Sequence, residues 1–335
     1  MLMGKLLIVG GTGFFGKSIL HSYFTEEIQR HGIDRIAVVS RHASDLRGAT
    51  TNRCRADIEF IDCDVRELTT LLDADIVIHA AASSDARRYR SDPIGERSII
   101  VDGTRRILEL VGQRETPVQL LYVSSGAVYG PQPTSVLTLA ENAAFADEPD
   151  PAKRAYMDAK RTAEALVLSA SRDKNIAASI ARCFAFVGPA LPLNQHFAIG
   201  NFIGDAVRRR PIAVTATRRV IRSYMFSDDL VDWLLAVAKA SSTDCPIFNV
   251  GSDEAVCVRD LAVMIGEIAD VDVTLPDLAE PEVLHRYVPS TDRARARLGV
   301  STRFSLRRAI EETLRRQLAQ TRTLFASRIT AFGAA

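Results

Sequence analysis

The chain has 335 residues, of which 47% are apolar and 25% are charged, and its 42 Lys and Arg nearly balance its 41 Asp and Glu. At roughly 100–200 residues per domain, this length predicts two to three structural units with a large core. The composition argues against disorder, a collagen-like repeat and a coiled coil. The near-neutral charge argues against a dedicated nucleic-acid-binding protein, because phosphate contacts require a basic excess.

Cysteine and histidine usage argues against disulfides and metals. The five cysteines form no Cys-x-x-Cys pair, and the six histidines show no His-x-x-x-His spacing. This pattern indicates a reducing compartment and predicts no metal site. No segment approaches the roughly 20 apolar residues of a membrane span. We therefore expect a soluble cytoplasmic protein with neither a membrane nor a nucleic-acid partner.

Short apolar runs alternate with helical patterns through the first half of the chain. Strands are predicted at residues 6–9, 36–39, 58–61, 75–79, 118–123 and 178–184. Helices are predicted at about 15–23, 94–111 and 152–171. Continuous apolar strands with helices between them indicate a parallel sheet that is covered on both faces. Right-handed crossovers then give a doubly wound α/β fold of the Rossmann type.

The pattern changes after residue 189. Beyond a loop rich in Pro and Asn, we expect further elements at residues 202–209 (helix), 246–250 (strand), 258–269 (helix) and 306–321 (helix). Residues 1–186 are interpreted as a dinucleotide-binding domain, and the chain returns to this domain at roughly residues 218–251. A smaller C-terminal α/β substrate lobe is assigned to residues 187–217 and 252–325. The active site is expected in the cleft between the two parts.

A glycine-rich loop follows the first predicted strand and opens the first predicted helix. Its sequence is Gly-Gly-Thr-Gly-Phe-Phe-Gly, at residues 10–16, which satisfies the Gly-x-Gly-x-x-Gly pattern. Glycines are required there because the turn needs permissive dihedral angles and the backbone must approach a pyrophosphate closely. The helix N-terminus then holds the anion. The candidate cofactor-binding residues of this loop are Gly10, Gly13, Phe14, Phe15 and Gly16.

The residues after the second strand bear on the choice of cofactor. An NAD-specific site would carry Asp or Glu there for the ribose 2′-hydroxyl, whereas this strand ends in Ser40 and Arg41. A hydroxyl and a guanidinium attract a 2′-phosphate, so NADP(H) is favoured and NAD(H) is the alternative. Arg41 would otherwise face solvent or stack on adenine. Further candidates along the cofactor are Asp64 and Val65, with Asp62 as an equal alternative, and Ala80, Ala81 and Ala82.

A phenol and an ammonium group lie four residues apart on the helix predicted at 152–171, as Tyr156 and Lys160. That spacing puts both side chains on one face of the helix. A phenol with an unperturbed pKa of about 10 is a weak base at pH 7, and a neighbouring ammonium favours its phenolate form. Tyr156 could then exchange a proton with a sugar hydroxyl or ketone while hydride moves to or from a nicotinamide. Lys160 could also hydrogen-bond the nicotinamide ribose.

Serines follow the fifth strand at the edge where ligands bind in parallel sheets. The sequence there is Tyr-Val-Ser-Ser-Gly-Ala-Val-Tyr-Gly, at residues 122–130. Ser125 could donate a hydrogen bond to the substrate oxygen that Tyr156 serves, and Ser124 is a further candidate for substrate contact. The alternative is that both serines only cap the end of the strand.

Taken together, these motifs resemble those of the extended short-chain dehydrogenases/reductases that act on nucleotide sugars. The resemblance covers about residues 4–318, and it extends to four further segments, at residues 78–81, 182–189, 222–229 and 249–251. It implies that Ser125, Tyr156 and Lys160 are the catalytic triad. It also implies that Arg222 binds the diphosphate of a nucleotide-diphosphate sugar, a task that suits a planar guanidinium. The alternative for Arg222 is a structural salt bridge.

Several positions depart from the family pattern. Ala185 stands where the family has Asn, and the segment at 215–217 replaces a Gly-Asp-Gly sequence. The family's last diphosphate-binding arginine has no clear match, and Arg286 is the candidate. His196 and Asn201, above the expected cleft, are candidates for substrate contact or for capping. We therefore expect an unusual pocket for the sugar and the base.

The family resemblance leaves three reactions to compare: 4-epimerisation, 4,6-dehydration and ketone reduction. Dehydration needs a further acid and base, which in the dehydratases follow the catalytic Thr or Ser, but Gly126 and Ala127 occupy those positions here. Reductases consume NADPH, so Ser40 and Arg41 favour reduction of a 4-keto-6-deoxysugar. Residues 191–203 also resemble bacterial enzymes of deoxysugar synthesis for surface polysaccharide. The alternatives are a 4-epimerase that retains its cofactor and, less favoured, a non-catalytic NADP-binding protein.

The resemblance also bears on assembly. Similar proteins often dimerise through the helices that correspond here to residues 94–111 and 156–170, as a four-helix bundle. A homodimer is therefore expected.

Overall fold

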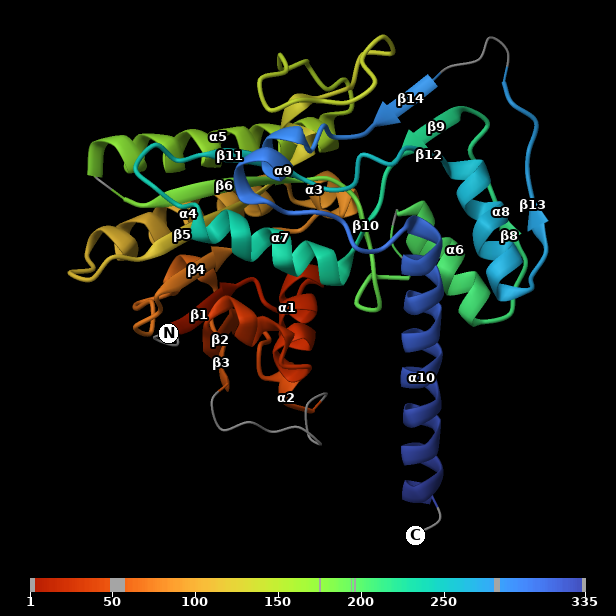
Figure 1. Ribbon diagram of the computed structural model, residues 1–335, viewed down its shortest axis with the longest axis horizontal. Coiled ribbons are helices and arrows are strands. Elements are labelled where there is room, and N and C mark those ends of the chain that lie inside the picture. The colour runs from red at the N-terminus through yellow and green to blue at the C-terminus, as the bar shows by residue number, and fades with distance from the viewer. Residues whose placement is uncertain are drawn as a thin grey trace.

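A seven-stranded parallel sheet forms the centre of the larger lobe (Figure 1). The computed structural model describes residues 4–48, 58–174, 176–193, 195, 197–279 and 284–332. The strands lie side by side in the order β11-β6-β5-β4-β1-β2-β3. Their bounds are β1 (Gly4–Val9), β2 (Ile33–Ser40), β3 (Ile58–Asp62), β4 (Ile76–His79), β5 (Gln119–Ser125), β6 (Ala178–Cys183) and β11 (Ile247–Val250). The predicted doubly wound α/β fold is confirmed.

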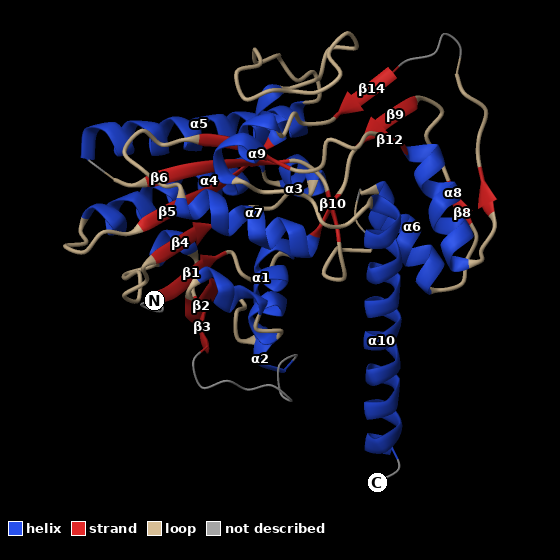
Figure 2. Ribbon diagram, viewed as in Figure 1, coloured by secondary structure: helices blue, strands red, loops and turns tan. Residues whose placement is uncertain are grey.

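The sheet is apolar on both faces, because successive side chains of a strand point to opposite sides. Four long helices cover it: α1 (Phe14–Phe24), α4 (Pro93–Gly112), α5 (Pro151–Lys174) and α7 (Ser227–Lys239) (Figure 2). In β1, Leu6 and Ile8 share a core with α1 and α7, whereas Leu7 and Val9 share a core with α4 and α5. This alternation explains why the strand is a continuous apolar run.

The smaller lobe packs three helices against short strands. The helices are α6 (Ala198–Val207), α8 (Val258–Ala269) and α10 (Leu306–Phe332), whose later half extends away from the rest of the chain (Figure 1). Ile203, Leu261 and Ile310 belong to their common core. A three-stranded sheet has the order β12 (Val256–Cys257), β9 (Arg219–Arg222) and β14 (Leu284–Tyr287). Two further pairs are β8 (Ile212–Ala213) with β13 (Val273–Thr274), and β7 (Phe186–Val187) with β10 (Met225–Phe226).

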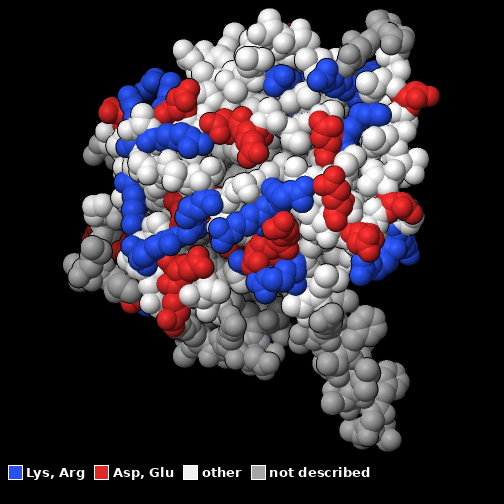
Figure 3. Space-filling model, turned by 45° about the vertical axis from the view of Figure 1, so that its right-hand side comes forward, with Lys and Arg blue, Asp and Glu red and all other residues white. Residues whose placement is uncertain are grey.

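The remaining helical segments are short connections. They are η1 (Glu27–His31), α2 (Asp45–Gly48), η2 (Val65–Glu67), α3 (Ala86–Ser91), η3 (Gly126–Tyr129) and α9 (Asp292–Leu298). Basic and acidic side chains are interspersed on the face that Figure 3 shows. Within the described ranges, no helix combines the length and apolarity that crossing a bilayer requires, and no group of three or more His, Cys, Asp or Glu could hold a metal ion.

The sequence analysis does not include α7, although this helix is amphipathic. Leu230, Trp233, Leu234 and Leu235 are fully buried, whereas Asp228, Asp232 and Lys239 lie on its more exposed side. Helix α6 begins before the predicted residue 202, and α10 continues past the predicted residue 321.

Candidate active site

The carboxyl ends of β1, β4 and β5 meet at one edge of the sheet. Strand β4 lies between β1 and β5 in the sheet. Gly10 follows β1, Ala80 follows β4, and Ser125 is the last residue of β5. The chain order of the strands reverses beside β1, and doubly wound sheets bind their ligands at such a point. The fold therefore brings the glycine loop and Ser125 to the same edge.

The glycine loop is packed too closely for side chains. Gly10 has a φ of +92°, and a Cβ there would lie 2.7 Å from the backbone of Ala80. A Cβ on Gly16 would lie 2.2 Å from the carbonyl oxygen of Gly11. Helix α1 starts after Gly13, and no side chain caps the N-terminus of this helix. The loop thus fits a dinucleotide pyrophosphate, which the amides at the start of α1 could hold.

Phe14 and Phe15 form an aromatic cluster with Phe186. The ring centroids of Phe14 and Phe15 lie 6.1 Å and 5.5 Å from that of Phe186. Both side chains are half-buried. The cluster packs the start of α1 against β7, so only the backbone of these two residues and the exposed side of their rings could contact a cofactor.

The end of β2 presents a hydroxyl and a guanidinium. The hydroxyl oxygens of Ser40 and Thr12 lie 2.7 Å apart, and the side chain of Arg41 is exposed. The carboxylate of Asp64 accepts hydrogen bonds from the backbone and the guanidinium of Arg66, at 2.8–3.0 Å. These hydrogen bonds, and the charge of Arg66, hold the pKa of Asp64 below its usual value. The carboxylate of Asp64 is therefore hydrogen-bonded to Arg66 and not to Arg41.

The other predicted cofactor residues differ in their exposure. Asp62 accepts hydrogen bonds from the backbone and hydroxyl of Ser44, at 2.8 Å and 2.5 Å. Val65 is buried in the core beside α4, so only its backbone could face adenine. Ala81 and Ala82, like the preceding alanine, remain partly exposed at the end of β4 and leave room for a ligand.

The structure brings the three predicted catalytic residues together. Tyr156 and Lys160 lie on α5, and the Ser125 hydroxyl lies near enough to the phenol of Tyr156 to lower the pKa of that phenol. The ammonium of Lys160 donates to the carbonyl oxygen of Val123 at 2.8 Å. It lies 6.0 Å from the ring centroid of Tyr156 and 5.0 Å from that of Tyr122. The phenol of Tyr156, the hydroxyl of Ser125 and the ammonium of Lys160 therefore lie close together.

Burial controls the protonation of the phenol and the ammonium. It raises the pKa of Tyr156 to about 12, although the hydrogen bond with Ser125 opposes this shift. Burial also lowers the pKa of Lys160 to about 8, against the opposing influence of Cys183 and Glu164. The sequence predicts that the ammonium favours the phenolate, but in the structure Lys160 is directed to the Val123 carbonyl, and burial of the phenol prevails. At neutral pH Tyr156 therefore carries its proton.

A buried ion pair lies beneath the triad. The guanidinium of Arg182 on β6 donates to the carboxylate of Glu164 on α5, at 2.7 Å, and both side chains are only 5% exposed. Arg182 also donates to the hydroxyl of Tyr129 at 3.0 Å. The hydroxyl of Ser124 donates to the same carboxylate at 2.5 Å. The prediction that Ser124 contacts substrate is corrected accordingly: its hydroxyl faces this core ion pair, because successive residues of β5 point to opposite sides.

The two candidate diphosphate-binding arginines lie on neighbouring strands of the smaller lobe. Arg222 is paired with Tyr287 in the register of β9 and β14, and Arg286 is paired with Ile221, so the two arginines project from opposite faces. Burial lowers the pKa of Arg222, whose guanidinium donates to the carbonyl of Ile221 at 2.8 Å. The Nε of Arg286 is buried and has no hydrogen-bond partner among the described residues. Either guanidinium could still gain an anion.

Asn201 lies on α6 at the rim of a pocket of about 430 Å³ in the smaller lobe. Phe202, Asp205 and residues 213–216 also line this pocket. Its size suits a small ligand group. His196, the other substrate candidate in this segment, lies outside the described residues.

Tyr287 is a residue of the site that the sequence analysis missed. Its ring lies 4.6 Å from that of Phe184, and the Ser125 hydroxyl nearby partly offsets the rise that burial produces in the pKa of its phenol. A Cβ on Gly126 would lie 2.6 Å from the Tyr287 hydroxyl. Only the pairing of β14 with β9 places Tyr287 here, and no local motif around it announces that pairing.

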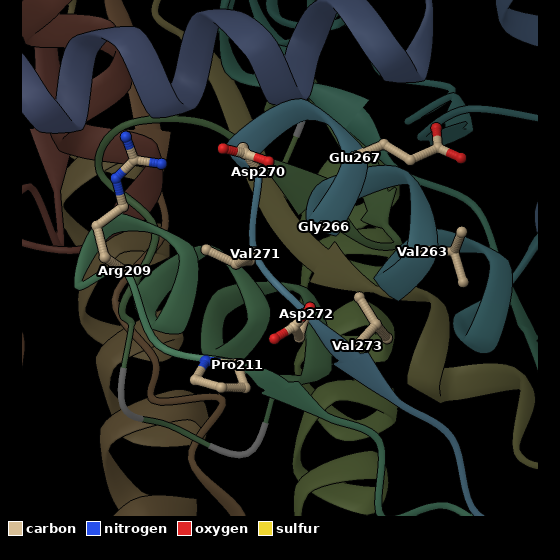
Figure 4. Close-up of a pocket in the computed structure, with 9 residues that line it drawn as sticks. All are labelled: Arg209, Pro211, Val263, Gly266, Glu267, Asp270, Val271, Asp272 and Val273. Carbon is tan, nitrogen blue, oxygen red and sulfur yellow. The ribbon is translucent and has the colours of Figure 1, made fainter.

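A larger groove lies away from the triad. It has a volume of about 520 Å³ and is lined by the α6–β8 connection and by the end of α8 with the start of β13 (Figure 4). Arg209, on its rim, donates to the carbonyl of Ala269 at 2.7 Å. Its lining residues include Glu267, Asp270 and Asp272, none of which belongs to the predicted site.

The doubly wound sheet and its glycine loop define a dinucleotide-binding protein of the Rossmann class. Residues 6–251 match the profile of the NAD dependent epimerase/dehydratase family. The chain belongs to this family.

Relatives and solved structures agree with this assignment. UDP-glucuronic acid decarboxylase 2 of Arabidopsis thaliana is 26% identical over 311 residues, which cover 91% of this chain and 66% of the relative. This chain thus spans just under two thirds of that relative's length. Two solved structures are 18% identical and share the fold. They are UDP-glucose 4-epimerase of Thermotoga maritima with UDP-glucose (TM-score 0.77, 95% of this chain and 99% of that one) and Bordetella bronchiseptica WbmF with NAD+ and UDP (0.74, 99% and 98%).

We expect Gly16→Ala to weaken the binding of a nicotinamide dinucleotide about tenfold or more, because the added Cβ would collide with the Gly11 backbone. Fluorescence titration with the reduced dinucleotide measures the change. Gly112→Ala is the matched control, since its Cβ would have its nearest neighbour 3.9 Å away. Equal affinities for the two variants would contradict the assignment of the loop.

Proposed function

We propose that this chain reduces the C4 ketone of a nucleotide-diphosphate 4-keto-6-deoxysugar to an alcohol. The observation that carries the proposal is the half-buried Tyr156 beside Lys160: desolvation raises the pKa of its phenol to about 12, so the phenol keeps its proton at neutral pH. The NAD dependent family and its relatives that are named for UDP-linked sugars support a nucleotide sugar as the substrate.

Reduction requires a hydride on the ketone carbon and a proton on its oxygen. A reduced nicotinamide dinucleotide, when bound, supplies the hydride. Tyr156 donates its proton to the ketone oxygen, and Ser125 donates a hydrogen bond to that oxygen as negative charge develops on it. Lys160 uses one N–H for the Val123 carbonyl and keeps two others. Its positive charge stabilises the phenolate that remains on Tyr156.

The same site disfavours dehydration. That reaction needs further proton transfers, and Gly126 and Ala127 supply no group for them. Burial raises the pKa of the Tyr156 phenol to about 12, so this phenol is available as a proton donor to a ketone oxygen.

A 4-epimerase that retains NAD is the second candidate. The family is described as NAD dependent, and one of the similar structures is a UDP-glucose 4-epimerase. An epimerase oxidises and then reduces C4 within one turnover, so it consumes no cofactor. Net cofactor consumption therefore separates the two candidates.

We propose NADP(H) as the cofactor of the reductase because of the charge at the end of β2. The exposed guanidinium of Arg41 stands there, while the carboxylates of Asp62 and Asp64 are occupied by Ser44 and Arg66. A cation at this place attracts a ribose 2′-phosphate.

We propose that the smaller lobe binds the diphosphate and the nucleoside of the substrate. Arg222 would hold the diphosphate, because its buried guanidinium gains from a nearby anion. The pocket of about 430 Å³ beside Asn201 would hold the nucleoside.

A panel of nucleotide 4-keto-6-deoxysugars with NADPH tests the reaction. We expect loss of the reduced nicotinamide absorbance with a 4-keto sugar and none with ordinary nucleotide hexoses. Tyr156→Phe should lower kcat about a hundredfold or more and leave cofactor binding unchanged, because only the proton donor is lost. Interconversion of hexoses without net cofactor consumption would establish the epimerase instead.

The rate of reduction should depend on pH through Lys160. Burial lowers the pKa of this ammonium to about 8, so its charge is present below that pH and lost above it, while Tyr156 is still protonated. We therefore expect kcat to fall as the pH rises through about 8, and Lys160→Met to show a low kcat without this decline. A wild-type profile that stays flat up to the unperturbed lysine pKa of about 10.4 would refute this role.

The cofactor preference should reverse in Arg41→Asp. The new carboxylate would repel a 2′-phosphate and accept a hydrogen bond from a 2′-hydroxyl, so the ratio of kcat/KM for NADPH over NADH should fall about tenfold or more. Arg35→Asp, a change to an exposed arginine near the start of β2, is the control for charge alone. An unchanged ratio in Arg41→Asp would remove the support for NADP(H).

A further inference from the structure

The side chain of Lys160 is buried, although it ends in an ammonium group. The residue is only 3% exposed. One N–H of the ammonium donates to the carbonyl oxygen of Val123 at 2.8 Å. Glu164, one turn further along α5, is paired with Arg182 instead. A buried charge is costly unless its surroundings replace the water that it has lost. The other neighbours of this ammonium therefore determine whether it stays charged.

The aromatic ring of Tyr122 lies against this ammonium. The Nζ atom of Lys160 lies over the ring, 5.0 Å from its centroid, and is farther from the ring of Tyr156, at 6.0 Å. A cation within about 6 Å of a ring centroid is attracted to the negative face of the π system, and the attraction increases when both groups are desolvated. Tyr122 is itself buried, and it directly precedes Val123 on β5. Two consecutive residues of β5 thus contact the ammonium.

The register of the sheet fixes the position of the Tyr122 ring. Tyr122 pairs with His79 of the neighbouring strand β4, and the centroids of the two rings lie 5.6 Å apart. The side chain belongs to the core that the sheet shares with α4 and α5. Its hydroxyl is buried and has no hydrogen-bond partner among the described residues. Packing of the ring therefore holds this side chain in place.

The titratable groups around the ammonium contribute little charge at neutral pH. Burial lowers the pKa of His79 on β4 to about 3, so its imidazole is neutral. Burial raises the pKa of Cys183 on β6 to about 12, as it does for Tyr156 on α5, so both keep their protons. The charge of Glu164 is compensated by Arg182. The ring and the carbonyl on β5 are therefore the groups that favour the charged ammonium most directly.

We infer that Tyr122 is a positioning residue, whose ring holds the ammonium of Lys160 in its charged form beside Tyr156. The Val123 carbonyl orients the ammonium through one N–H, and the face of the ring stabilises its charge. The role in turnover rests on the function proposed above, whereas the stabilisation of the charge does not.

Titration of the lysines by NMR tests the contact without any substrate. The chain has six lysines, so protein with isotope-labelled lysine gives few signals, and Lys160→Met assigns the relevant one. Tyr122→Phe keeps the ring and should leave the titration of Lys160 unchanged. Partly and then fully fluorinated phenylalanine at residue 122 keeps the shape of the ring and weakens its negative face. We expect the acid dissociation constant of the ammonium to rise in steps, by about tenfold with the fully fluorinated ring.

The same series at residue 23 is the matched control. Tyr23 is fully buried, but it belongs to the core that the sheet shares with α1 and α7. Fluorination there should leave the titration of Lys160 unchanged. An acid dissociation constant that does not respond to fluorination at residue 122, or that changes equally in both series, would overturn the inference.

The pH profile of turnover, measured with the sugar that the panel identifies, tests the role in catalysis. With the fully fluorinated ring at residue 122, the decline of kcat should occur at an about tenfold higher proton concentration. At pH values well below this decline, kcat should match that of the wild type. A uniform loss of kcat with the decline unmoved would show that the ring has only a structural role. If the wild-type protein consumes no sugar of the panel, the proposed function fails, and the NMR titration alone decides the inference.

Discussion

The arrangement of the site depends on the ion pair between Arg182 and Glu164. It joins β6 to α5 in the core, and the hydroxyl of Ser124 attaches the end of β5 to the same carboxylate. Lys160 precedes Glu164 by one helical turn, so the pair also fixes the helix that carries the acid and the cation. Removing one partner of such a buried pair commonly costs about 3–5 kcal/mol, because the other charge is left uncompensated. The arrangement of Ser125, Tyr156 and Lys160 is therefore supported by core groups that lie beneath them.

The second determinant is the desolvation of Tyr156 and Lys160, the former half-buried and the latter buried. Three groups share a small volume at the sheet edge, and burial raises the pKa of Tyr156 while it lowers that of Lys160. Each shift disfavours the charged form of its group. The neutral phenol that results is the proton donor on which the proposed reduction depends.

Much of this organisation follows from local sequence. Parallel strands buried on both faces must be continuous apolar runs, and the glycine loop and the spacing of Tyr156 and Lys160 are local features, so the sheet, the loop and the grouping of these residues could be predicted. The place of Tyr287 and the orientation of Ser124 could not be predicted. Their environments are created by strands and helices that are distant in the sequence.

Gly126 lies where its neighbours leave no space for a side chain. The space where a side chain would begin is already filled by the Tyr287 hydroxyl and by the ring of Phe184, whose nearest atoms would be 2.6 Å and 2.8 Å away. An acidic residue introduced there would have to displace both aromatic side chains. A carboxylate at this position would therefore require coordinated replacements in β14 and in the segment after β6, and a single substitution would not suffice.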